Sequence, residues 1–138
     1  MAASSRPDLV DVALLRPGRI DKAVFCNFPE FEERKEIVKI YLEKFRFNEF
    51  LSESEMDDFL DELAAKTQFY TSADLKGLIQ NAQLSKMSEA LQALQANGGE
   101  EIEEFGIDRS DVRKAFKSFA RGMSEQEIMR FNKIYADY

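Results

Sequence analysis

The sequence predicts a mainly helical protein, in which a helical bundle follows a short segment of α/β character. From Glu30 onward, apolar residues recur three or four positions apart, which is the period of an amphipathic helix. Proline disrupts helix interiors, so the long stretch without proline is free to be helical. The prolines all precede that stretch: Pro7, Pro17 and Pro29. We therefore expect two parts, residues 1–29 and residues 30–138.

The first part is expected to contain one short strand. Residues 22–28 read Lys-Ala-Val-Phe-Cys-Asn-Phe, and their β-branched and aromatic content favours a strand. Cys26, which lies in this run, is expected to be a small buried hydrophobe. Asp11–Leu15 would form at most one helical turn. Because one or two strands cannot complete a sheet, we do not expect this part to fold alone.

The second part is expected to contain five helices, which cover about 31–46, 54–66, 71–96, 109–120 and the residues after 124. Residue pairs typical of a capping box precede three of them: Ser54 with Asp57, Thr71 with Asp74, and Ser124 with Glu127. Asn97-Gly98-Gly99 is expected to end the third helix, because these residues tolerate left-handed backbone angles.

The apolar face of each helix predicts the core. The expected core residues are Ile37, Ile40, Tyr41, Met56, Phe59, Leu60, Leu63, Leu75, Leu78, Ile79, Ala82, Val112, Ala115, Phe116, Phe119, Ile128, Phe131 and Tyr135.

Composition excludes several classes of function. The net charge of -7 disfavours nucleic acid, whose phosphates require Lys and Arg. The chain has no histidine, which removes His-based catalysis and the commonest metal ligand. The acidic runs at 53–62 and 100–104 are expected to be solvated, without a metal site. A single cysteine allows no internal disulfide. No apolar run reaches the roughly 20 residues of a membrane span.

The stretch Arg16-Pro17-Gly18-Arg19 is the strongest candidate for chemistry. Guanidinium groups are always charged, and their forked donors match phosphate oxygens. The alternative is a pair of surface arginines on a Pro-Gly turn. A phosphate-binding loop would need a Lys directly after a Gly, and no glycine here is followed by Lys. The pair Asp61-Glu62 lies on an expected helix, whereas a Mg²⁺-binding acidic pair would follow an apolar strand.

Several motifs together resemble one family. Ser5-Arg6-Pro7-Asp8, followed by the arginine stretch, resembles a signature of the classical clade of the AAA ATPases. Residues 34–41 are similar to the first helix of the lid in that family, and residues 69–75 (Phe-Tyr-Thr-Ser-Ala-Asp-Leu) to its lid motif. Ser72 replaces a glycine of that motif, and Gly122 stands where the family has proline. The likeness is greatest to the second ATPase domain of the peroxisome-biogenesis members.

The resemblance implies a role for each part. Residues 1–29 would be the C-terminal remnant of the α/β nucleotide-binding core, and residues 30–138 the helical lid. Arg16 and Arg19 would be fingers that reach the nucleotide of a neighbouring subunit, and Ser5 would hold the sensor-one position. Ile37 and Tyr41 would pack near the adenine and ribose, and Ser72 and Ala73 would lie beside the nucleotide. Ile37 and Tyr41 would equally suit an ordinary core, and Asp74 is expected to cap a helix.

The resemblance also implies a function: the C-terminal portion of an AAA subunit that couples ATP hydrolysis to protein extraction or unfolding, in the recycling of a peroxisomal import receptor. The partners would be other AAA subunits in a hexameric ring and a protein substrate. ATP would be the cofactor, with Mg²⁺ held by the missing part of the domain. The location would be cytoplasmic, peripheral on the peroxisomal membrane through partners. We expect a longer polypeptide, and no ATP hydrolysis by these residues alone. The alternatives are a truncated, non-enzymatic module that docks on AAA subunits and a helical bundle of chance similarity.

Overall fold

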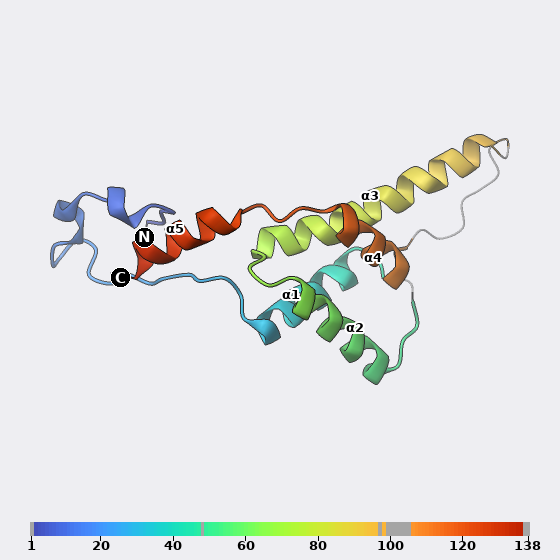
Figure 1. The fold of residues 1–138 in the computed structure, drawn as a ribbon, viewed down its shortest axis with the longest axis horizontal. Helices are drawn as coiled ribbons and strands as arrows, with labels where there is room; N and C mark the ends of the chain where they lie inside the picture. The colour runs from blue at the N-terminus through green and yellow to red at the C-terminus, as the bar shows by residue number, and fades with distance from the viewer. Residues whose placement is uncertain (1, 48, 97, 99–105, 137–138) are drawn as a thin grey trace. The chain divides into compact units, whose positions relative to one another are not determined.

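A computed structural model describes residues 2–47, 49–96, 98 and 106–136. The order of the helices is η1 (Pro7–Leu9), η2 (Val12–Leu15), α1 (Phe31–Lys44), α2 (Glu53–Lys66), α3 (Ser72–Ala96), α4 (Arg109–Ser118) and α5 (Glu125–Tyr135) (Figure 1). The predicted mainly helical fold is confirmed. The chain divides into two compact units, Phe28–Gly122 and Met1–Asn27 with Met123–Tyr138. The predicted assignment of residues 1–29 and 30–138 to two AAA subdomains stays a prediction.

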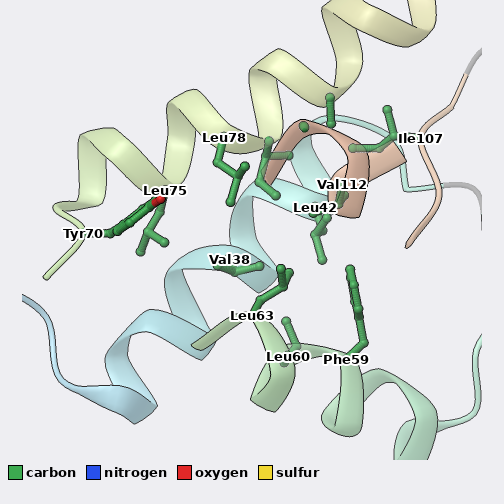
Figure 2. Close-up of a cluster of buried hydrophobic side chains, with 13 residues drawn as sticks. Val38, Leu42, Phe59, Leu60, Leu63, Tyr70, Leu75, Leu78, Ile107 and Val112 are labelled. Carbon is green, nitrogen blue, oxygen red and sulfur yellow. The ribbon is translucent and has the colours of Figure 1, made fainter. Parts of the chain in front are cut away.

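The core of the unit Phe28–Gly122 is built by α1 to α4. Helix α1 packs against α2 and α3, and α3 packs against α4. Figure 2 shows apolar side chains from these helices pointing toward one another. The buried cluster consists of Val38, Leu42, Phe59, Leu60, Leu63, Tyr70, Leu75, Leu78, Ile79, Ala82, Ile107, Val112 and Ala115. The apolar faces predicted for the second, third and fourth helices are thereby confirmed, with Met56, Phe116 and Phe119 partly buried against the cluster.

The face predicted for α1 is corrected. Val38 and Leu42 are buried, whereas Ile40 is 61% exposed. Ile37 and Tyr41 are partly buried at the edge of the cluster. Residues two positions apart lie about 200° apart around a helix, so burial of Val38 and Leu42 turns Ile40 toward solvent.

Two predicted helix starts are confirmed and one is corrected. The Thr71 hydroxyl accepts from the backbone N–H of Asp74, and Ser124 does the same for Glu127. Helix α2 is capped by Ser52 instead of Ser54, because the Ser52 hydroxyl accepts from the backbone N–H of Glu55. Residues 52–57 offer two overlapping boxes, Ser52 with Glu55 and Ser54 with Asp57, and the earlier one lengthens the helix.

The strand predicted at residues 22–28 is wrong, and so is the burial of Cys26. No strand forms within the part of the chain that the structure describes, where Phe47 and Ile107 make a lone β-bridge. Because no described strand lies beside residues 22–28 to pair with them, nothing covers Cys26, which is exposed. The helical turn predicted within Asp11–Leu15 is confirmed as η2.

Helix α5 lies in the same unit as the N-terminal residues. Ile128 is buried, and Phe131 and Tyr135 are half-buried and stack with their ring centroids 6.0 Å apart. The Phe25 ring lies 4.5 Å from that of Tyr135.

The predicted end of the third helix falls partly within the described residues. Gly98 has a left-handed φ of +78°. Asn97, Gly99 and the acidic run 100–104 lie outside the described residues.

Candidate functional site

The arginine stretch forms a tight turn. The backbone N–H of Arg19 donates to the carbonyl of Arg16 over 3.1 Å. Pro17 takes the second position of this turn and Gly18 the third, with a φ of +84°. Proline followed by a residue of positive φ is the pattern of a type II turn, whose first and fourth Cα atoms lie within about 7 Å. The turn therefore brings two exposed arginines together, as the sequence predicts.

Three hydrogen bonds fasten this turn to its neighbours. One carboxylate oxygen of Asp21 accepts from the backbone N–H of Gly18 over 2.6 Å. The backbone N–H of Ile20 donates to the carbonyl of Leu14 over 3.1 Å. The Arg19 guanidinium donates to the carbonyl of Ala13 over 2.9 Å. The turn is thus tied both to η2 and to Asp21.

The two arginines differ in how their side chains are used. The Arg19 guanidinium uses one of its N–H donors for the carbonyl of Ala13, and its other donors stay free in the described residues. No hydrogen bond or ion pair joins the Arg16 guanidinium to any residue within 2–47, 49–96, 98 and 106–136. Arg16 is therefore the fully available cation of the pair.

Ser5 lies in the same compact unit as these arginines. Its side chain is exposed, and its carbonyl accepts from the Tyr135 hydroxyl over 2.8 Å. Two nitrogens of the Arg6 guanidinium donate to the two carboxylate oxygens of Asp8, over 2.8 and 2.6 Å, and this hydrogen bonding lowers the pKa of Asp8. The segment around Ser5 is thereby held at both its backbone and its side chains.

The four residues expected near a nucleotide base belong to the other unit, Phe28–Gly122. Ile37 and Tyr41 lie one turn apart on α1, partly buried. Ser72 and Ala73 form the exposed first turn of α3. Since α1 and α3 pack together, these residues share one compact unit. The two arginines and Ser5 are not part of it.

Curated proteins similar to this chain were found, although no protein-family model matches it. Peroxisomal ATPase PEX1 of Dictyostelium discoideum is 45% identical over 95 residues, which are 69% of this chain and 7% of that protein. Peroxisomal ATPase PEX1 of Saccharomyces cerevisiae is 35% identical over 141 residues, 96% of this chain and 13% of that protein. ATPase family gene 2 protein of Schizosaccharomyces pombe is 44% identical over 93 residues, 67% and 11% respectively. The chain belongs to the AAA ATPase family.

This AAA chain spans only a small part of the length of those relatives. The chemistry of the expected lid residues can be compared with the base of ATP, and that of the acidic residues with its Mg²⁺. The half-exposed apolar side chains of Ile37 and Tyr41 suit a base, and the first turn of α3 offers backbone N–H groups without intrahelical partners. Nothing comparable suits Mg²⁺, because the described residues contain no group of three acidic, His or Cys side chains able to hold a metal ion.

A buried arginine of this AAA chain was missed by the sequence analysis. Arg34 is 8% exposed and donates through two nitrogens to the carbonyl of Ala64, over 3.1 and 2.9 Å. A third nitrogen donates to the carbonyl of Pro29 over 2.7 Å. The sequence held one signal for its burial: Arg34 lies four residues before Val38, on the same face of the helix. Arg34 fastens the start of α1 to the end of α2 and to the segment that enters the bundle.

A charged contact joins α2 to α4. Arg113 donates to both carboxylate oxygens of Glu62, over 3.2 and 2.7 Å, and Lys66 donates over 2.7 Å. These hydrogen bonds, that of Arg113 first, lower the pKa of Glu62 from its usual 4.5 to about 2.

Within the described residues, no helix combines the length and the apolar character needed to cross a bilayer.

Proposed function

We propose that this chain supplies the C-terminal portion of an AAA ATPase subunit that acts in peroxisome biogenesis. The subunit couples ATP hydrolysis to the extraction or unfolding of a protein, in the recycling of a peroxisomal import receptor. The observation that carries the proposal is the similarity to the peroxisomal ATPases PEX1 of a slime mould and a yeast, over 69% and 96% of this chain. Those proteins are much longer, so the activity proposed is that of a whole subunit.

In this proposal, Arg16 and Arg19 act on the nucleotide of the neighbouring subunit. Their charge stabilises the charge that develops on the transferred phosphoryl group, an effect worth about 10³ to 10⁵ in rate. The turn supports this role because it brings the backbones of two exposed arginines together and leaves the Arg16 guanidinium unpaired within the described residues. Ser5 holds the sensor-one position and orients the attacking water of its own subunit.

The lid residues contact the nucleotide of their own subunit. Ile37 and Tyr41 pack near the adenine and ribose, and Ser72 and Ala73 approach the nucleotide. When bound, ATP supplies the phosphoryl group whose transfer drives the motor. The phosphates and Mg²⁺ are held by residues outside this chain. These residues alone therefore do not hydrolyse ATP, because phosphate capture needs loop amides, a Lys and the metal.

The partners follow from the family. We place the subunit in a hexameric ring with other AAA subunits, where it acts on a protein substrate. The net charge of -7 argues against nucleic acid as a partner. The ring works on the cytoplasmic side, bound peripherally to the peroxisomal membrane through partners, without inserting a segment of this chain.

The test uses the full-length subunit that contains this segment, assembled with its partners. Arg16→Ala and Arg19→Ala are each expected to lower the rate of ATP hydrolysis about 10³-fold, the low end of the range for arginine fingers. Binding of a fluorescent ATP analogue is expected to persist, because the fingers act on a neighbour. Lys39→Ala, which removes an exposed cation of α1, is the control. Unchanged hydrolysis, or equal losses of binding and hydrolysis, would contradict the proposal.

A further inference from the structure

We propose that Asp21 is a positioning residue for Arg16. Its carboxylate holds the turn between the two arginines, so that the backbone beneath Arg16 is already ordered when the guanidinium meets an anion of the neighbouring subunit. This inference rests on the proposed function, since it concerns the same loop.

The geometry that carries the inference is the hydrogen bond between Gly18 and Asp21. In a type II turn, the backbone N–H of the third residue takes no part in the bond that closes the turn. Here that N–H, of Gly18, donates to the Asp21 carboxylate over 2.6 Å. A carboxylate acceptor makes a stronger bond than a neutral group. Asp21 therefore stabilises the residue whose positive φ the turn requires.

The other ties of the loop leave Arg16 as the free end. Arg19 and Ile20 bind back to the carbonyls of Ala13 and Leu14, which fixes one side of the turn to η2. Asp21 fixes the other side. The Arg16 side chain is exposed and has no partner in the described part of the chain. A fixed backbone beneath a free guanidinium lowers the entropic cost of placing it, and a displacement of about 1 Å can cost on the order of a hundredfold in rate.

The inference rests on a hydrogen-bond acceptor at residue 21, to which the charge of the carboxylate adds strength. Asp21→Asn keeps a carbonyl oxygen at the same distance from the backbone, whereas Asp21→Ala removes it and Asp21→Glu displaces it by one methylene. In the full-length assembled ring, Asp21→Ala is expected to lower kcat by about ten- to a hundredfold, by displacement of the finger. The KM for ATP should stay unchanged. Asp21→Asn is expected to recover most of that loss, and Asp21→Glu is not.

A double-mutant cycle separates this inference from the proposed function. If Asp21 acts only through Arg16, Asp21→Ala causes no further loss in a ring that already carries Arg16→Ala. Asp58→Ala, which removes an exposed carboxylate of α2, is the matched control. An Arg16→Ala variant with normal turnover would refute the proposed function itself.

Three other results would overturn the inference while leaving the proposed function intact. One is a loss on Arg16→Ala without a loss on Asp21→Ala. Another is a full, additive loss in the double variant. The third is an equal loss on Asp21→Asn and Asp21→Ala. If Asp21→Ala fails to assemble, the comparison of Asp21→Asn with Asp21→Glu decides the matter.

Discussion

Asp74 joins the first turn of α3 to Gly122, beyond the end of α4. One carboxylate oxygen of Asp74 accepts from both the backbone N–H and the hydroxyl of Thr71, over 2.9 and 2.8 Å. The other accepts from the backbone N–H of Gly122 over 3.0 Å. A Cβ on Gly122 would lie 2.8 Å from that oxygen, which explains a glycine at this position. Proline, which the family has there, could not donate this bond.

The two roles of Asp74 predict that removing its side chain lowers the free energy of unfolding more than removing the Thr71 hydroxyl does. Thr71→Ala is expected to lower the free energy of unfolding by about 1 kcal/mol, because α3 loses its cap. Asp74→Ala is expected to cost about 2 kcal/mol, since it also releases Gly122. Urea unfolding of the chain, followed by circular dichroism, measures both. Asp58→Ala is the control, and equal losses for the two variants would contradict the bond to Gly122.

The buried position of Arg34 predicts a large effect on stability. Arg34→Leu leaves the carbonyls of Ala64 and Pro29 without their donors. Because hydrogen bonds from a charged group contribute about 1.5 to 3 kcal/mol, we expect the free energy of unfolding to fall by about 2 to 3 kcal/mol. Lys39→Leu, on the exposed face of α1, should change it by less than about 0.5 kcal/mol. Similar values for the two variants would show that Arg34 does not fasten the helices.

The lowered pKa of Glu62 predicts that part of the stability depends on pH. A carboxyl whose folded pKa lies below its unfolded value stabilises the fold above the unfolded value, and this contribution is lost as pH falls. For Glu62 the window runs from about 4.5 down to about 2. Because Arg113 and Lys66 are half-exposed, we expect at most about 1 kcal/mol.

Arg113→Ala tests this contact between α2 and α4. The difference in unfolding free energy between this variant and the unchanged chain should be present at pH 6 and shrink toward pH 2.5. Lys117→Ala removes an exposed cation of the same helix that pairs with no carboxylate in the described residues, and should show no such trend. A difference that stays constant with pH would mean that Arg113 stabilises the fold through packing on the Phe59 ring instead.

The positive φ of Gly18 predicts that backbone strain, and not crowding, decides which residues this position accepts. A Cβ there would meet no atom within 4 Å, so Gly18→Ala is strained by its φ of +84° and not by crowding. We expect a cost of more than about 1 kcal/mol to the turn. In the assembled ring, ATP turnover should fall for Gly18→Ala and fall less for Gly18→Asn, because Asn tolerates the left-handed region better. Equal turnover for both variants would argue against the turn.

Helices were predictable because their signals are local. The periodic apolar residues of α3, with Thr71 and Asp74 before them, fix that helix almost to its ends. The face of α1 was misread because its buried residues include an arginine, which the hydrophobic pattern cannot reveal. The strand at residues 22–28 failed for a different reason. Strand formation depends on partners, and the described chain offers that segment none.

The turn at the candidate site was predictable from the sequence, whereas the hydrogen bonds that hold it were not. Proline and glycine between two arginines specify the turn, and the structure has it. The contacts of Arg19 with Ala13 and of Asp21 with Gly18 depend on side-chain conformations that no spacing encodes. The assignments of Arg16 and Arg19 as fingers, of Ser5 and of the four lid residues stay predictions.

Mixed rings test most directly the claim that this loop serves a neighbouring active site. Full-length subunits that carry Arg16→Ala are combined with subunits that cannot bind ATP, so that each defect lies in a different subunit. The account predicts that rings of either variant alone are inactive and that alternating rings regain turnover, because each subunit that binds ATP then faces the intact Arg16 of its ATP-free neighbour. It further predicts that wild-type subunits regain turnover when placed beside the ATP-free variant. Alternating rings that stay inactive, while wild-type subunits beside the ATP-free variant turn over, would mean that Arg16 does not act across the interface, and would contradict the account.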